Sequence, residues 1–128
     1  LFVGWSKDKI GVDIERLDRK LVCTEITNRF FNEKDRLRLE GLSEDLLKER
    51  ILKIWVIKES LVKWQKGTLF KGLKEWEINE ESGTASNKNV KSIVNIHNLR
   101  FLKWEIGIAS SLKIKAKDIK IELIKNLI

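Results

Sequence analysis

Two acidic side chains with the spacing of a shared strand face occur early in the chain, at Asp13 and Glu15. They belong to the alternating segment 10–15, so on a strand its apolar residues would point to the opposite side. Adjacent carboxylates repel each other unless a cation lies between them, and Mg²⁺ prefers carboxylate oxygen as a ligand. The pair is therefore a candidate metal site. Taken alone, it is more typical of an amphipathic strand with a solvated acidic face.

A second group of charged residues lies in segment 55–63. Trp55, Glu59 and Lys63 are four residues apart, which places them on one face of a helix, with Lys58 beside them. One carboxylate flanked by two lysines is what a site needs to complete a metal shell and to neutralise a phosphate. Taken alone, the segment is more typical of a surface Glu59–Lys63 ion pair worth about 0.3 kcal/mol.

The order of three short motifs resembles that of a known enzyme family. The chain contains Gly11-Val12-Asp13-Ile14-Glu15, then Arg29-Phe30-Phe31, then Trp55-x-x-Lys58-Glu59-Ser60-x-x-Lys63. These motifs, in this order, resemble the 4′-phosphopantetheinyl transferases. The tryptophan and the Lys-Glu-Ser step resemble the surfactin-synthetase-activating branch, and the resemblance is to its C-terminal catalytic lobe.

This resemblance implies a reaction and a role for each matching residue. Such enzymes move the phosphopantetheine arm of coenzyme A onto a serine of an acidic acyl or peptidyl carrier protein and release 3′,5′-ADP. Asp13, Glu15 and Glu59 would hold Mg²⁺ on the coenzyme A pyrophosphate. Glu59 would also be the general base for the serine, directly or through a bound water. Lys63 would stabilise the transferring or leaving phosphate, and Lys58 would contact phosphate from a neighbouring position.

The elements that must position these residues are predicted from periodicity and caps. Helical patterns cover three stretches, with caps expected at Asn32 and Ser43 and an end at Gly67: residues 22–31, 33–40 and 43–65. Strand patterns cover further stretches, with a polar turn at 7–9 and a turn-rich break at 82–89: residues 1–6, 10–15, 76–78, 90–96, 99–110 and 118–125. We therefore expect a single α+β domain over residues 1–128, with helices packed on an antiparallel sheet.

The net charge and the cysteine count indicate which partners and which cellular compartment suit the chain. The chain has a formal net charge of +7 and a pI near 9.6, which favours anionic partners such as coenzyme A and acidic carrier proteins. The single cysteine, Cys23, excludes an intrachain disulfide and fits the reducing cytoplasm. No apolar run in the sequence has the length of a membrane span. We expect neither a nucleic-acid nor a membrane partner.

The length of the chain matches one lobe of the two-lobed branch that it resembles. The chain contains no methionine and starts on a strand-like segment at Leu1, so we expect that an N-terminal part is missing. Two arrangements remain open: the chain is a piece of a longer enzyme, or it pairs with another copy. In both cases an apolar lobe-facing surface favours association.

Two other classes of function fit part of the pattern. A metal-dependent nuclease or phosphodiesterase would use the same carboxylates and lysines, but its acidic-x-Lys step belongs on a strand, whereas Glu59 lies in a helical pattern. A non-catalytic basic nucleic-acid-binding module would gather arginines and aromatic residues on one exposed face. That interpretation leaves the acidic residues without a role.

Overall fold

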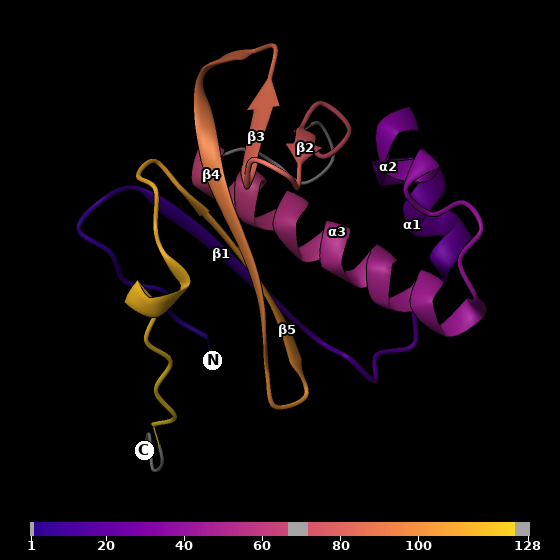
Figure 1. The fold of residues 1–128 in the computed structure, drawn as a ribbon, viewed down its shortest axis with the longest axis horizontal. Coiled ribbons are helices and arrows are strands. Elements are labelled where there is room, and N and C mark those ends of the chain that lie inside the picture. Colours follow the sequence, from indigo (N-terminus) through magenta and orange to yellow (C-terminus); the bar gives the residue numbers. More distant parts are fainter. Residues whose placement is uncertain (1, 67–71, 125–128) are drawn as a thin grey trace.

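The computed structural model of the protein describes residues 2–66 and 72–124, in which helices cover one face of an antiparallel sheet (Figure 1). Five strands in these residues form the sheet in the order β1-β5-β4-β3-β2. The strands are β1 (Ile10–Arg16), β2 (Glu77–Asn79), β3 (Thr84–Asn87), β4 (Val90–Phe101) and β5 (Trp104–Ser110). The helices are α1 (Cys23–Phe30), α2 (Glu33–Leu37), α3 (Glu44–Gln65) and a short 3₁₀ helix, Ala116–Asp118. The predicted α+β fold is confirmed.

The long helix α3 lies directly on β1 and β5 because two glycines face it. A β-carbon at Gly11 would lie 2.0 Å from the backbone oxygen of Ser60, and one at Gly107 would lie 2.3 Å from that of Val56. Any side chain at either position would push the helix away from the sheet. The two glycines therefore set the distance between α3 and the strand that carries Asp13 and Glu15.

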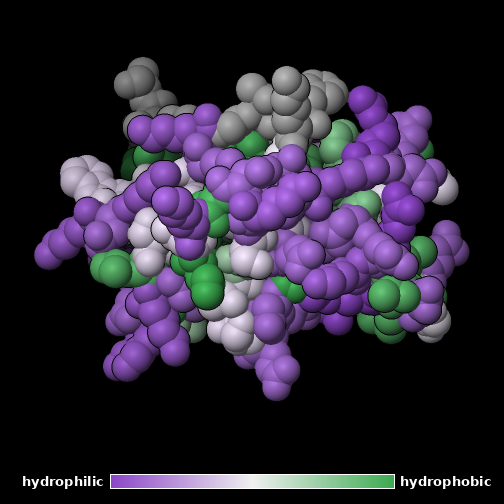
Figure 2. Space-filling model, turned by 90° about the horizontal axis from the view of Figure 1, so that it is seen from above, coloured by the Kyte–Doolittle hydropathy of each residue, from purple (hydrophilic) through white to green (hydrophobic). Residues whose placement is uncertain are grey.

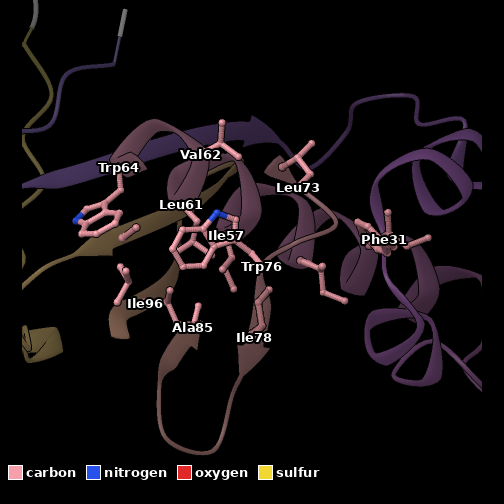
Figure 3. Packing of buried hydrophobic residues seen from close by; sticks show 14 residues of the cluster. Phe31, Ile57, Leu61, Val62, Trp64, Leu73, Trp76, Ile78, Ala85 and Ile96 are labelled. Atoms are coloured by element: carbon pink, nitrogen blue, oxygen red, sulfur yellow. The ribbon is translucent and has the colours of Figure 1, made fainter. Parts of the chain in front are cut away.

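The core lies between α3 and strands β2 to β4 (Figure 3). Trp64 and Trp76 meet edge to face, with their ring centroids 6.2 Å apart. Fully or almost fully buried side chains surround them: Ile57, Leu61, Val62, Leu73, Ile78, Ala85 and Ile96. Phe31, which follows α1, is also fully buried. This apolar packing anchors the second half of α3.

The predicted helix caps differ in what their side chains do. Asn32 caps α2 as expected, because its side chain accepts from the backbone N–H of Asp35 and the Asp35 carboxylate accepts from the backbone N–H of Asn32. Ser43 lies at the N-cap of α3, but its side chain makes no capping hydrogen bond. The expected helix end at Gly67 lies outside the described residues, and α3 ends at Gln65 with Lys66 in the left-handed region at φ 58°.

Four predictions about strands are wrong in the described residues. The segment 99–110 is not one strand, because β4 continues to Phe101 and a turn at 102–103 separates it from β5. Residues 2–9 form no strand, and Gly4 instead lies against the side chain of Val12 on the face of β1. Residues 119–124 form no strand either, although their apolar positions alternate. The turn-rich break contains β3, a short strand that pairs with β2 and β4. Apolar alternation marks a buried face, but a strand also needs a partner for its backbone groups.

The sheet face opposite α3 is apolar and incompletely covered. Val12, Ile106 and Ile108 line a groove of about 790 Å³ together with side chains from both terminal segments. These two segments lie side by side, on the side of the molecule away from α1 and α2 (Figure 1). Trp5, in the first segment, is 94% exposed. This face contrasts with the view from above, where hydrophilic side chains dominate and hydrophobic ones form small separate areas (Figure 2).

None of the helices in residues 2–66 and 72–124 has the length and apolarity that crossing a membrane requires.

Candidate active site

Three carboxylates from β1 and α3 meet at the edge of the sheet. Asp13, Glu15 and Glu59 each offer an oxygen, and these oxygens all lie within 4.8 Å of one another. Asp13 is 5% exposed, and Glu15 and Glu59 are partly buried. The sequence predicted that these three residues lie together, and the structure brings them together. We call them the acid cluster.

The local fold explains why the acid cluster forms. Alternation along β1 places Gly11, Asp13 and Glu15 on the face that α3 covers, and the strand register pairs Asp13 with Gly107 of β5. Both glycines admit the backbone of α3, so the helix passes close beside the two carboxylates. Glu59 then faces β1 from the helix.

Two cations flank the acid cluster. The Lys63 ammonium, with its side chain 50% exposed, lies 2.7 Å from Asp13 Oδ1. The Arg19 guanidinium lies 2.5 Å from Glu15 Oε1 and is 49% exposed. Lys63 was expected at this site from the sequence, and Arg19 was not. Both cations keep a solvent-exposed part that an anionic ligand can reach.

A turn after β1 brings Arg19 back to the acid cluster. The backbone N–H of Arg19 donates to the carbonyl of Arg16, and the Arg16 side chain pairs with Asp18 at 2.7 Å. The sequence signal for this placement is the four-residue spacing from Glu15 to Arg19. That spacing indicates proximity on a helix, whereas the segment here is a strand followed by a turn, so the signal is not specific.

The electrostatics of the acid cluster favour protonation of one member. Partial burial and the neighbouring charge of Asp13 raise the pKa of Glu59 to about 8, with Glu15 adding to the shift and Lys63 opposing it. The pKa of Arg19 is raised through its contact with Glu15. The crowding of carboxylates thus costs free energy whenever all three are ionised and no further cation is present.

The acid cluster has the chemistry of a site for a hard divalent cation. Asp13 Oδ2 is buried and has no hydrogen-bond partner among the described residues, although buried carboxylate oxygens are normally satisfied. One carboxylate oxygen from each of the three residues, which belong to two different elements, lies within 4.8 Å of the other two. Mg²⁺ typically uses one or two carboxylates together with water and substrate phosphates, so the residues present fit such an ion.

A fourth carboxylate lies beside the acid cluster but is fully satisfied. Glu105 on β5 is the direct partner of Glu15 in the strand register and is buried. Its oxygens accept from Asn98 Nδ2 at 2.7 Å and from Arg100 Nε at 3.0 Å. Because its charge is balanced by an arginine, Glu105 does not need a metal ion. Glu105 was not predicted as a site residue from the sequence.

Lys58 lies away from the acid cluster, contrary to the expectation that it contacts phosphate. Its side chain is 0% exposed, and its ammonium lies 2.5 Å from Asp35 Oδ2. The ammonium also donates to the carbonyls of Leu73 at 2.8 Å and Trp76 at 3.0 Å. Burial lowers the pKa of Lys58, and the charge of Asp35 opposes this shift. With three partners and no exposed surface, Lys58 has no donor to offer a substrate.

The remaining motif residues have packing roles. The rings of Trp55 and Phe30 meet edge to face with centroids 5.0 Å apart, which joins α1 to α3. Phe31 contributes to the core. Trp55 therefore packs between α1 and α3.

Comparison with known proteins provides a family match. Residues 9–119 match the family model described as 4′-phosphopantetheinyl transferase superfamily. Comparison with curated protein sequences gives no significant match.

Two solved structures have a similar fold. One is a holo-(acyl-carrier-protein) synthase from Bacillus anthracis in complex with CoA (3′,5′-ADP), with a TM-score of 0.67 and 20% identity; the match covers 79% of this chain and 92% of that one. The other is the holo-[acyl-carrier-protein] synthase of Thermotoga maritima, with a TM-score of 0.58 and 12% identity; the match covers 79% of this chain and 61% of that one.

Proposed function

Because the chain belongs to the 4′-phosphopantetheinyl transferase superfamily, we propose that it transfers the 4′-phosphopantetheine group of coenzyme A to a serine of a carrier protein. The reaction would depend on Mg²⁺ and release 3′,5′-ADP. The observation that carries this proposal is the acid cluster, with its unpartnered buried oxygen on Asp13 and the half-exposed Lys63 beside it. The basic net charge of +7 suits a polyanionic cosubstrate and an acidic carrier.

Asp13, Glu15 and Glu59 would hold the metal ion on the pyrophosphate of coenzyme A. The ion would supply neutralisation of the charge that develops on the phosphoryl group and the leaving group. Lys63 would leave its contact with Asp13 Oδ1 to donate to a phosphate oxygen, which its half-exposed ammonium is free to reach. Arg19, paired with Glu15 on the other side, balances the remaining negative charge in the metal-free protein.

Glu59 would act as the general base for the carrier serine. Its carboxylate would accept the hydroxyl proton as the serine oxygen forms a bond to the phosphorus that bears the pantetheine arm. The bond from this phosphorus to the bridging oxygen breaks, and the electron pair leaves with 3′,5′-ADP. Burial and the charge of Asp13 raise the pKa of Glu59 to about 8 in the metal-free protein, and a bound cation would lower this pKa and keep the carboxylate ionised, as a base must be.

The test of this proposal is the conversion of an apo carrier protein. The chain is incubated with coenzyme A, Mg²⁺ and each of several apo carriers, and the carriers are followed by intact mass spectrometry. We expect a mass gain equal to one phosphopantetheine group, and no gain when the metal is chelated. The absence of any gain across fatty-acid, polyketide and peptide-synthetase carriers would refute the proposed activity.

Membership of the surfactin-synthetase-activating branch stays a prediction. It is supported by Trp55 and by the Lys58-Glu59-Ser60 step, whereas the two structural neighbours carry the name of the holo-synthase type. The carriers in the mass experiment address this point. Modification of peptidyl carriers as well as acyl carriers would support the predicted branch, and strict use of a fatty-acid carrier would contradict it.

We propose further that the apolar sheet face associates with a second copy of the chain. The groove of about 790 Å³ is lined by Val12, Ile106, Ile108 and terminal segments that lack strands and α-helices in the described residues. Large exposed apolar patches are rare on monomers. Light scattering should give a mass above 15.0 kDa, and Ile108→Lys should lower it. A monodisperse monomer would contradict pairing, and a partner lobe that binds this face would replace the second copy as its occupant.

A further inference from the structure

Two fully buried charges meet on the side of α3 that faces away from the acid cluster, at the junction with α2. Lys58 and Asp35 both have side chains that are 0% exposed, and their charged atoms lie 2.5 Å apart. An ammonium has three N–H donors, and here they meet Asp35 Oδ2 and the carbonyls of Leu73 and Trp76. The orientation of the Lys58 head group is therefore completely determined.

Three separate segments meet at this ammonium. Lys58 belongs to the middle of α3, whereas Asp35 belongs to the capping box that begins α2. The carbonyls of Leu73 and Trp76 lie in the segment that leads into β2. Asn32 reinforces the junction, because its side-chain amide donates to the carbonyls of Lys74 and Trp76. The ion pair thus links α3 to elements remote from β1.

Stability alone does not require an ion pair at this position. Removing two charges from water costs several kcal/mol each, and a well-packed apolar pair is often at least as stable as a buried ion pair. The ion pair instead fixes the orientation of α3. An ammonium with three fixed acceptors resists rotation and sliding of the helix that carries it. Gly11 and Gly107 set the approach of α3 to the sheet, but glycines have no side chains with which to fix its rotation.

We infer that Lys58 and Asp35 are positioning residues, which fix the rotation of α3 so that Glu59 meets Asp13 and Glu15. Successive residues of a helix point about 100° apart, so the direction of Lys58 determines that of its neighbour Glu59. A small rotation of α3 would carry the Glu59 carboxylate away from β1 and open the acid cluster. The inference rests on the proposed function only where it concerns the rate of transfer.

The decisive variant replaces the ion pair by apolar side chains, Lys58→Met with Asp35→Leu. Its matched control is Arg50→Met with Glu80→Leu, which removes a partly exposed ion pair between α3 and the turn after β2. We expect the decisive variant to be less stable in urea than the control, because it also removes the Asp35 half of the capping box and the Lys58 donor to the carbonyls of Leu73 and Trp76. Its metal affinity is therefore measured on protein that circular dichroism shows to be folded. We also expect its affinity for Mg²⁺, measured by titration calorimetry without coenzyme A or carrier, to fall about tenfold. The control should keep the affinity of the unmodified chain.

The kinetic expectation separates positioning from general destabilisation. In the decisive variant kcat for carrier modification should fall at least tenfold while KM for coenzyme A stays within about threefold, because misplacement of a reacting group by a fraction of an ångström lowers the rate of the chemical step. Lys58→Arg keeps the charge but alters the head group, and it should lower Mg²⁺ affinity by about threefold. If the double variant does not fold, Lys58→Arg decides the question alone.

The possible outcomes distinguish this inference from the proposed function. Unchanged Mg²⁺ affinity in the folded double variant, or in Lys58→Arg where that variant decides, would overturn the positioning role. Mg²⁺ binding by the unmodified chain without any carrier modification would refute the transferase and leave the positioning test valid. If the unmodified chain binds no Mg²⁺, the acid cluster is not a metal site and the positioning role stated for it is also refuted.

Discussion

Two groups of charged side chains flank the same stretch of α3, and they differ in how their charges are balanced. In the acid cluster, three carboxylates face the half-exposed cations Lys63 and Arg19, and one buried oxygen of Asp13 lacks a partner among the described residues. In the buried pair, Lys58 and Asp35 have opposite charges and no exposed surface. The second oxygen of Asp35 makes no hydrogen bond in the described residues and lies 3.7 Å from Arg38. A solvent-accessible group with excess negative charge can take up a cation, whereas an enclosed ion pair holds the elements around it.

The comparison also shows that sequence neighbours on a helix can serve opposite purposes. Lys58 and Glu59 are adjacent, yet one points into the junction with α2 and the other faces β1. The motif Lys58-Glu59-Ser60 therefore contains a structural residue, Lys58, directly next to Glu59 of the acid cluster. Substitutions on the two sides of α3 should separate these roles.

The largest expected effect is the loss of transfer in Glu59→Gln. The substitution removes a metal ligand and the general base together, so we expect the rate of carrier modification to fall about 1000-fold. The buried pair is untouched, and the fold should be retained, as measured by circular dichroism and urea unfolding. Metal binding to Asp13 and Glu15 alone should become too weak to measure by calorimetry.

The matched control for that variant is Glu49→Gln. Glu49 lies on the same helix, is exposed, and pairs with Arg100 at 3.5 Å. It should keep full activity. A Glu59→Gln protein as active as Glu49→Gln would show that the acid cluster does not serve the reaction.

The second largest effect is expected at Gly107, where the backbone of α3 lies against β5. In Gly107→Ala the new methyl group would lie 2.3 Å from the Val56 carbonyl oxygen, and backbone cannot move aside as a side chain can. We expect a loss of about 3 kcal/mol in the free energy of unfolding. Because the helix is pushed off the β1–β5 edge, Mg²⁺ affinity measured on the folded protein should also fall.

Gly4→Ala provides the control for this substitution. The three atoms nearest to a methyl group at Gly4 are side-chain atoms of Val12 and Ile10 on the opposite face of the sheet, and side chains can shift more easily than backbone. Its free energy of unfolding should change by less than about 1 kcal/mol. If Gly107→Ala and Gly4→Ala lost the same free energy of unfolding, the close approach of α3 to Gly107 would not be what makes Gly107→Ala destabilising.

A smaller effect is expected at the capping box that holds the buried pair. Asn32→Ala removes the side-chain cap of α2 and the amide donors to the carbonyls of Lys74 and Trp76, which should cost about 2 kcal/mol in urea unfolding. Ser43→Ala, at the cap of α3 that makes no side-chain hydrogen bond, should cost less than about 0.5 kcal/mol. A larger loss at Ser43 than at Asn32 would contradict this ranking of the two caps.

The acid cluster could be predicted from the sequence, and the buried pair could not. Strand alternation and helix periodicity determine which faces carry Asp13, Glu15 and Glu59, and the order of the motifs indicated that the faces meet. The partner of Lys58 depends on how α2 packs against α3, and no local pattern contains that information. Lys58 was therefore assigned to phosphate because of its sequence neighbours, although its side chain is enclosed by the fold.

The strand predictions failed for a related reason. Residues 119–124 alternate apolar and polar side chains, and in the structure Ile119, Ile121 and Leu123 line the groove without a strand. Alternation reports which side chains need an apolar surface, and it does not report whether a neighbouring strand is available. The edge strand β1 was predicted to within one residue. The turn between β4 and β5 was missed, because Leu102-Lys103 contains none of the residues that usually mark a hairpin turn, although Leu102 has φ 53°.

The smallest expected effect is a pH dependence that only the acid cluster should produce. The ordinary pKa of a glutamate, 4.5, applies to the unfolded chain, and in the folded, metal-free protein the pKa of Glu59 is raised to about 8. Between these values the folded state binds more protons than the unfolded state, so the free energy of unfolding should fall as pH rises from about 4.5 to 8. Because Glu59 is partly exposed, the decrease should be on the order of 1 kcal/mol.

Glu59→Gln should remove this pH dependence of the free energy of unfolding. Added Mg²⁺ should offset the decrease, since the metal binds the ionised carboxylates. Urea unfolding at several pH values measures the slope, with Glu49→Gln as the control, and a slope that survives in Glu59→Gln would assign the titration to another group.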